Sequence, residues 1–193
     1  MSDRLSLNPK STALLVMDFQ MMIVNGYAVD KEALLARAAK LIDAARKAEA
    51  MVLYVVVGFR AGHPEISPRN LAFSAAKASG RFAAGDADAA IHPAVAPRDG
   101  EVVVTKHRVG AFMGTDLDMI LRANFIDTLL LAGIATSGVV LSTLRHGADA
   151  DYRLVVVEDC CSDADEEVHR VLMHKVFPRQ AAVAAAGDVI AAL

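Results

Sequence analysis

The sequence predicts an α/β protein with a doubly wound, mostly parallel β-sheet, and two observations support this fold class. Short apolar runs alternate with segments of helical periodicity along the 193 residues. The runs are apolar throughout, without the alternation of a half-exposed sheet, and this is typical of parallel strands buried on both faces. Domains usually hold about 50–200 residues. Because no linker or repeat divides the chain, we expect a single domain over residues 1–193.

Five apolar runs are predicted to be buried strands, and one shorter segment is predicted to be an edge strand. In chain order they are residues 13–17, 51–57, 101–105, 128–132 and 153–157, with the edge strand at 181–185. Valine and leucine dominate most of the buried runs. Branched side chains of this kind pack well on a pleated surface.

The segments between the strands favour helices. The expected helices are residues 30–50, 72–78, 115–123, 137–150 and 166–175, with a last helical turn that ends at 193. Asp30 and Thr115 are the predicted N-caps of two of them. The stretch from 58 to 98 is otherwise irregular, with scattered Gly, Pro and Asn. Long loops in compact domains are often functional, so we expect this one to contribute to a site.

Two ionisable side chains follow predicted strands at the edge of the sheet where ligands bind in such folds. Asp18 comes directly after the first strand and can act as a general acid or base if burial raises its pKa. An aspartate that only caps or turns the chain is the alternative. Lys106 follows the third strand and can hold that carboxylate or stabilise a developing anion. A solvated surface lysine is the alternative for this position.

The segment Gly133–Gly138 joins the fourth strand to a helix and is built from small residues. A tight turn of this kind can direct backbone N–H groups into the cleft, where they would bind an anion or oxyanion. An ordinary turn with Thr136 or Ser137 as the N-cap explains the same residues.

Composition and charge exclude several classes of function. The net charge of −3 and the isoelectric point of about 6.0 leave no basic patch for a nucleic acid. No apolar stretch approaches the roughly 18 residues of a membrane span. The N-terminus lacks the apolar region of a secretory signal, so we expect a cytoplasmic protein. The adjacent Cys160 and Cys161 give neither a disulfide framework nor a zinc-ligand spacing. No cofactor is expected, and no metal, because His63 has no aspartate near it in the sequence.

Four motifs in order resemble those of the isochorismatase-like (cysteine hydrolase) family. They are Leu14–Gln20 (LLVMDFQ), Lys106–Leu117 (KHRVGAFMGTDL), Gly133–Thr143 (GIATSGVVLST), and Val156–Asp163 (VVEDCCSD) together with His169. The resemblance runs from about Thr12 to Val183. It implies a three-layer α/β/α fold with a six-stranded sheet, and a homodimer or homotetramer. It also implies an acid–base role for Asp18, the family's lysine role for Lys106, and a cis peptide at Ile134–Ala135.

Val139 occupies the position where the resemblance implies a nucleophilic cysteine, and valine cannot attack a carbonyl. Ser137 would point elsewhere on the turn, Ser142 lies a helical turn onward, and the two cysteines are placed past the fifth strand. One family reaction, the hydrolysis of a vinyl ether, needs only a carboxylic acid and water. Asp18 with Lys106 would suffice for it.

Three functions therefore remain. The first is a hydrolase that uses Asp18, Lys106 and water on a small, anionic substrate. The second is a non-catalytic member that binds a small molecule or a partner, and the third is an amidohydrolase with an unrecognised nucleophile. An enzyme should show a buried carboxylate near Lys106 with open space beyond Val139, whereas side chains should fill that space in a non-catalytic protein.

Five further residues are candidates for substrate binding. Arg60 and Arg108 can hold an anionic substrate through their guanidinium groups, although a surface arginine explains Arg60 equally well. Phe19, Phe59 and Phe112 can form walls of the pocket, and each fits the hydrophobic core as well.

Overall fold

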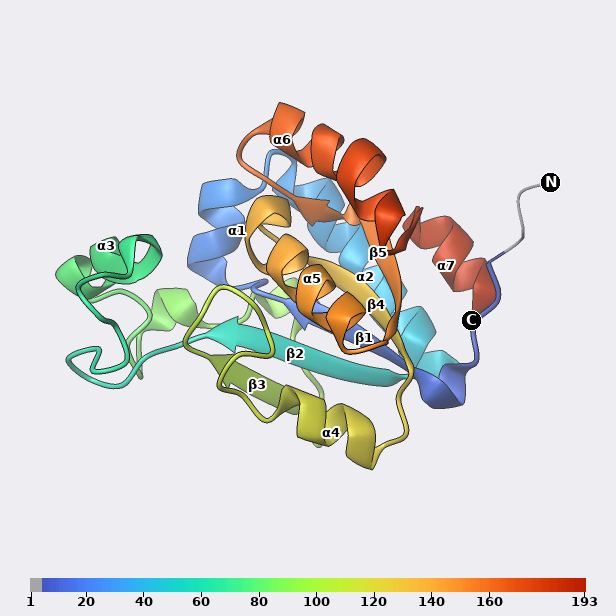
Figure 1. Cartoon of the computed structure of the whole chain (residues 1–193), viewed down its shortest axis with the longest axis horizontal. Coiled ribbons are helices and arrows are strands. Elements are labelled where there is room, and N and C mark those ends of the chain that lie inside the picture. The colour runs from blue at the N-terminus through green and yellow to red at the C-terminus, as the bar shows by residue number, and fades with distance from the viewer. Residues whose placement is uncertain (1–4) are drawn as a thin grey trace.

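A computed structural model describes residues 5–193 and places six parallel strands between two layers of helices (Figure 1). The strands are β1 (Thr12–Met17), β2 (Met51–Val57), β3 (Val102–Lys106), β4 (Thr128–Ile134), β5 (Arg153–Ser162) and β6 (Ala182–Ala184). Their order in the sheet is β3-β2-β1-β4-β5-β6, and every adjacent pair is parallel. The predicted three-layer α/β/α fold is confirmed, and the sheet is wholly parallel within the described range.

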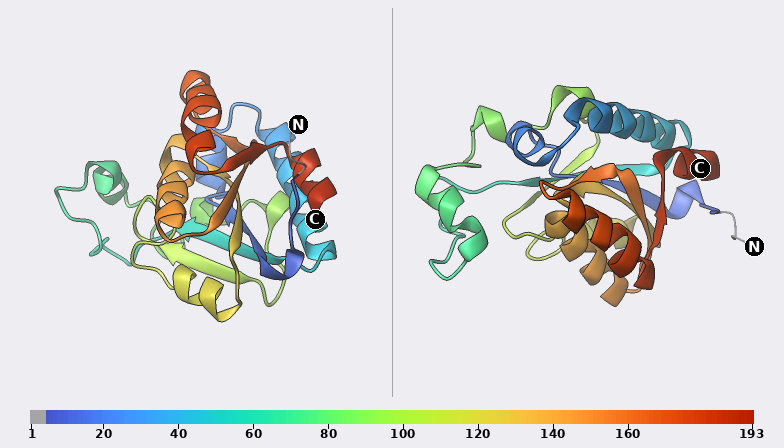
Figure 2. Two further views of the ribbon diagram at one scale, coloured as in Figure 1. Left: turned by 45° about the vertical axis from the view of Figure 1, so that its right-hand side comes forward. Right: turned by 90° about the horizontal axis from the view of Figure 1, so that it is seen from above.

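Helices cover both faces of the sheet, as the edge-on view in Figure 2 shows. One face carries α1 (Met21–Tyr27), α2 (Lys31–Lys47) and α7 (Ala186–Ala192), and the other carries α4 (Leu117–Ala123), α5 (Leu141–Asp149) and α6 (Glu166–Val171). Helix α3 (Leu71–Ser79) belongs to neither layer and projects beyond the carboxyl end of β2 (Figure 1). None of the helices between residues 5 and 193 has the length and apolar character needed to cross a membrane.

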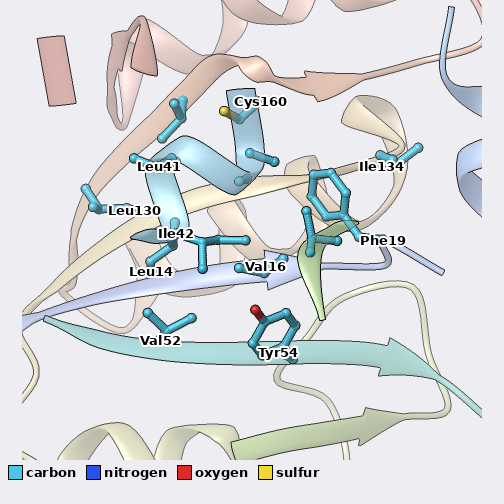
Figure 3. Close-up of a cluster of buried hydrophobic side chains, with 14 of the residues drawn as sticks. Leu14, Val16, Phe19, Leu41, Ile42, Val52, Tyr54, Leu130, Ile134 and Cys160 are labelled. Carbon is cyan, nitrogen blue, oxygen red and sulfur yellow. The ribbon is translucent and has the colours of Figure 1, made fainter. Parts of the chain in front are cut away.

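Alternate residues of the central strand pack into two separate cores. Leu14 and Val16 of β1 point toward Leu41 and Ile42 of α2, as Figure 3 shows. Leu15 and its neighbours on the opposite face of β1 pack against α4 and α5. Complete burial of a side chain of this size stabilises the fold by about 1.5–3 kcal/mol. The uniformly apolar strand sequence is therefore explained by two buried faces.

The structure differs from the sequence-based prediction in several elements. Helix α1 was not predicted, because it has only seven residues and buries only Ile23 and Val24. Strand β5 continues to Ser162, so the adjacent cysteines lie within the strand and not past it. The polar pair Glu158-Asp159 interrupts the apolar pattern there, and the pairing with β4 shifts register between Leu131 and Gly133.

Three helix boundaries also differ. The segment predicted as one helix from 137 begins with a π-helical turn over Thr136–Val140, before α5. A second π-helical turn, Leu172–Val176, continues α6. Helix α4 starts at Leu117 with Asp116 in the cap position, so the expected Thr115 cap is wrong by one residue. Thr115 still contributes, because its Oγ1 accepts a hydrogen bond from the Leu117 N–H at 3.3 Å.

Gly133 of β4 pairs with Met17 of β1 in a tightly packed position, and this packing has a testable consequence. A Cβ at this position would lie 3.1 Å from both Cβ and O of Met17 and 3.2 Å from Cγ2 of Val140. We expect Gly133→Ala to lower the free energy of unfolding by about 1–3 kcal/mol, measured by urea denaturation, because the crowded strands must separate. Gly187→Ala in α7 is the control. Nothing lies within 4 Å of a Cβ there, so equal destabilisation by both changes would contradict this interpretation.

Candidate active site

Asp18 and Lys106 form a buried ion pair at the carboxyl edge of the sheet. Asp18 directly follows β1, Lys106 ends β3, and β2 lies between these two strands. Lys106 Nζ is 2.9 Å from Asp18 Oδ2, and the two side chains are 2% and 7% exposed. The structure therefore brings together the two charged residues that sequence analysis selected at separate strand ends.

Hydrogen bonds to β2 fix the backbone that carries Asp18. The Asp18 N–H donates to the Val55 carbonyl at 2.8 Å. The buried side chain of Gln20 donates to the Val57 carbonyl at 2.9 Å and accepts from the Val57 N–H at 2.8 Å. Asp18 itself has a φ of 59°, in the left-handed region that non-glycine residues seldom adopt. Such conformations cluster at functional sites, where the surrounding structure holds them.

The surroundings of Asp18 raise its pKa above the ordinary value of an aspartic acid. Burial raises the pKa of the Asp18 carboxyl, and the neighbouring Lys106 ammonium opposes that shift without cancelling it. Asp18 Oδ2 faces Lys106, whereas Oδ1 is buried and has no hydrogen-bond partner among residues 5–193. Oδ1 is therefore the atom that can hold a proton while Oδ2 keeps its hydrogen bond from Lys106.

A cavity of about 340 Å³ lies against this pair. Asp18, Lys106 and Val139 all line it, so the space beyond Val139 is open. The remaining lining residues come from five parts of the chain: Ile23, Tyr27, Val57, Ala72, Phe73, Ala75, Ala76, Arg81, Phe82, Val109, Ile134, Ala135, Ser137 and Gly138. A buried carboxylate near Lys106 with open space beyond Val139 is the arrangement that we expect of an enzyme in this fold.

The loop from Ile134 to Val139 forms one wall of the cavity. Its Ile134–Ala135 peptide is cis, as expected. The Ser137 N–H donates to Asp163 Oδ2 at 2.7 Å, and the Gly138 N–H donates to the Ala135 carbonyl at 3.1 Å. Those two amides are therefore already bonded, which leaves the loop fewer donors for an oxyanion than its sequence indicated.

A side-chain contact between Thr136 and His169 also holds the same loop in place. Thr136 is fully buried, and its Oγ1 is 2.8 Å from Nδ1 of His169. Burial lowers the pKa of the His169 imidazole. Thr136 is therefore tied to the helix after β5, and it does not serve as a simple N-cap, because the turn it opens has no side-chain cap bond.

The five residues proposed to bind substrate do not line this cavity, and other contacts occupy them. Phe19 and Phe59 are buried in the core on the α2 face, and Phe112 stacks on His146 at a centroid distance of 4.4 Å in the opposite core. Arg60 forms an ion pair with Glu65 at 2.7 Å. Arg108 Nη1 donates to the carbonyls of Glu65 and His107.

The residues that sequence reasoning missed come mainly from the segment 71–82, which includes α3. Ala72, Phe73, Ala75 and Ala76 of this segment line the cavity, followed by Arg81 and Phe82. The irregular sequence had marked the wider region as functional. The sequence did not indicate which residues of that region would line the cavity beside Asp18, because no periodic apolar pattern predicts that α3 packs on the sheet.

None of the alternative nucleophiles has a favourable environment. Burial raises the pKa of the Cys160 thiol to about 12 and also raises that of Cys161, whose Sγ lies 3.6 Å from the Leu131 carbonyl. Ser142 lies against Gly110 and does not line the cavity. Ser137 does line it, but none of its hydrogen bonds joins its hydroxyl to a base within the described range.

Comparison with known proteins decides the family. The profile of the isochorismatase domain matches residues 12–188. The chain belongs to the isochorismatase family. The matched range contains Asp18, Lys106 and the whole Ile134–Val139 loop. The family assignment from the four sequence motifs is thus confirmed.

Three relatives illustrate the range of similarity. The isochorismatase family protein YwoC of Bacillus subtilis is 34% identical over 180 residues, which is 93% of this chain and 92% of that protein. The ureidoacrylate amidohydrolase RutB of Methylobacterium radiotolerans is 32% identical over 198 residues, 89% of this chain and 75% of that protein. A solved isochorismatase family protein of Burkholderia thailandensis superposes with a TM-score of 0.84 at 33% identity, over 99% of both chains.

Proposed function

We propose that this protein is a hydrolase that uses Asp18 as a general acid, Lys106 as its partner and water as the nucleophile, on a small, anionic substrate. One observation carries the proposal. The Asp18 carboxyl is buried with a raised pKa, Oδ2 is bonded to Lys106, Oδ1 has no hydrogen-bond partner among residues 5–193, and Asp18 and Val139 line the same cavity. A carboxylic acid whose pKa is raised in this way can donate a proton at a higher pH than an ordinary aspartic acid.

The hydrolysis of a vinyl ether fits these groups. Asp18 Oδ1 would deliver its proton to the terminal alkene carbon, which leaves an oxocarbenium ion. Water would add to the oxygen-bearing carbon of that ion and pass a proton back to the Asp18 carboxylate. The resulting hemiketal would then divide into a ketone and an alcohol, with its hydroxyl proton ending on the alcohol. Lys106 would stabilise the carboxylate formed in the first step, since its ammonium lies 2.9 Å from Oδ2.

A non-catalytic binding protein on the same scaffold is less well supported. That hypothesis expects side chains to fill the space beyond Val139, and the cavity occupies it instead. A binding protein also has no need of a buried carboxyl with an unbonded oxygen, whose desolvation costs free energy. Turnover of any vinyl ether or small anionic ester, with loss of that turnover in Asp18→Asn, would decide for the enzyme. A ligand that raises the melting temperature without being converted would decide for the binding protein.

Amidohydrolase chemistry is the second candidate, because RutB, a similar protein, is an amidohydrolase by name. It requires a nucleophile in this chain, and we expect none of the native thiols to serve. Iodoacetamide at neutral pH should add to neither Cys160 nor Cys161 in the folded protein, since burial raises the pKa of both thiols. Val139→Cys should gain one adduct, because its thiol would face the cavity beside Lys106.

Intact-protein mass spectrometry checks this expectation. An adduct on native Cys161 would contradict it and restore the amidohydrolase hypothesis. The control is the unfolded wild-type protein in urea, in which both cysteines should react.

A further inference from the structure

The backbone around Arg81 is fixed on both sides. The Arg81 N–H donates to the Ala76 carbonyl at 3.0 Å, and Nε2 of the buried His63 lies 2.7 Å from the Arg81 carbonyl. The next residue is held as well, because the Phe82 N–H donates to Asp86 at 2.9 Å and the Phe82 carbonyl accepts from Phe59 at 2.8 Å. The position of the Arg81 Cα at the rim of the cavity is therefore well determined.

The Arg81 side chain has no counter-charge. It lines the cavity from an exposed position at its rim, and it forms neither an ion pair nor a side-chain hydrogen bond with any residue from 5 to 193. The other two charged groups of the lining, Asp18 and Lys106, are bonded to each other. When both of these are ionised their charges cancel, so Arg81 gives the cavity one net positive charge.

The rest of the lining is suited to a compact, nonpolar body. Phe73 and Phe82 contribute aromatic surface, and Ala72, Ala75 and Ala76 leave space along α3. The cavity volume of about 340 Å³ lies at the small end of the range for ligand pockets, about 300–1,000 Å³. Such a cavity takes a ligand of one ring or a short chain.

We infer that Arg81 determines specificity by binding a carboxylate of the substrate, while the nonpolar body lies between the aromatic side chains and Val139. The planar guanidinium matches a carboxylate with two parallel hydrogen bonds. This inference deepens the proposed function and rests on it, because it places the anionic group of the substrate on Arg81 and leaves the reacting atom for Asp18. The substrate class is thus a small carboxylate with a nonpolar, unsaturated body.

Binding of benzoate and of its neutral analogue benzamide tests this inference without catalysis. We expect the wild-type protein to bind benzoate more tightly than benzamide, measured by calorimetry or ligand-observed NMR. Arg81→Gln should weaken benzoate binding by about tenfold or more and change benzamide binding by less than about twofold, since hydrogen bonds to charged groups carry that much affinity. Arg81→Lys keeps the positive charge but lacks the planar guanidinium group. Its affinity for benzoate should lie between those of the wild type and of Arg81→Gln.

Arg60→Gln is the matched control, because Arg60 also belongs to the loop after β2 but is paired with Glu65 and lies outside the cavity lining. It should leave both affinities within about twofold of wild type. Equal binding of benzoate and benzamide by the wild type, or unchanged benzoate affinity in Arg81→Gln, would overturn the assignment. Asp18→Asn should keep the preference for benzoate, so a failure of the proposed chemistry is distinguishable from a failure of this inference.

Discussion

Asp18→Asn should lower kcat/KM by about 10²- to 10⁴-fold, the range that a positioned general acid contributes. Asparagine has nearly the same shape as aspartic acid but cannot release a proton to the substrate. The binding of a nonreacting carboxylate should persist, because Asp18 is not the group that holds it. Steady-state kinetics with an anionic vinyl ether, and benzoate titration of the same variant, measure the two properties separately. Undiminished turnover in this variant would exclude Asp18 as the acid.

The pH dependence follows from the direction of the pKa shift. The acid must be protonated to act, and burial raises the pKa of Asp18 above its ordinary value. Activity should therefore be full below the folded-state pKa and fall about tenfold for each pH unit above it, until another step limits the rate. An ordinary surface aspartate would already be inactive near pH 5. A rate that rises with pH through this range would instead indicate that the carboxylate acts as a base.

Lys106→Met should lower the free energy of unfolding by about 3–5 kcal/mol at neutral pH, because it leaves the Asp18 carboxylate buried without its partner. The loss should depend on pH. With desolvation unopposed, the folded-state pKa of Asp18 stays above the unfolded value. The stability that the protonated Asp18 gives the variant is therefore fully present below the unfolded-state pKa. It is lost as the pH rises through the folded-state pKa. Urea denaturation of variant and wild type at several pH values measures the difference.

The double variant Asp18→Asn with Lys106→Met is the control for this interpretation. It removes both charges together, so most of the lost stability should return even though the protein is inactive. If the single and double variants were equally unstable, loss of packing around the lysine stem would explain the effect. A single variant within about 1 kcal/mol of wild type at all pH values would show that the two charges are not coupled.

The sequence located the charged pair because strand ends are predictable. Apolar runs mark buried parallel strands, and polar residues directly after them lie at one edge of the sheet. Asp18 and Lys106 both met that condition, and they lie 2.9 Å apart. The cis peptide at Ile134–Ala135 followed from the family motif alone, since no local pattern of charge or hydropathy distinguishes it.

The walls of the cavity were not predictable in the same way. Arg60 is nearer to a strand end in sequence than Arg81, yet Arg60 pairs with Glu65 and Arg81 reaches the cavity. The left-handed C-cap of α3 at Gly80, with a φ of 69°, and the buried His63 decide where Arg81 lies. These are tertiary contacts between segments about 18 positions apart. Large apolar residues such as Phe19 fit a core or a pocket equally well, and only the packed structure distinguishes the two.

The position of β3 at the margin of the sheet has a consequence for inactivation. This strand pairs only with β2 and ends with Lys106, whereas Asp18 follows β1, which is paired on both sides. Edge strands undergo local unfolding more readily than central strands. Mild heating or a low concentration of denaturant should thus separate the Lys106 ammonium group from Asp18 while the central strands stay folded. Loss of the proposed activity should therefore precede global unfolding.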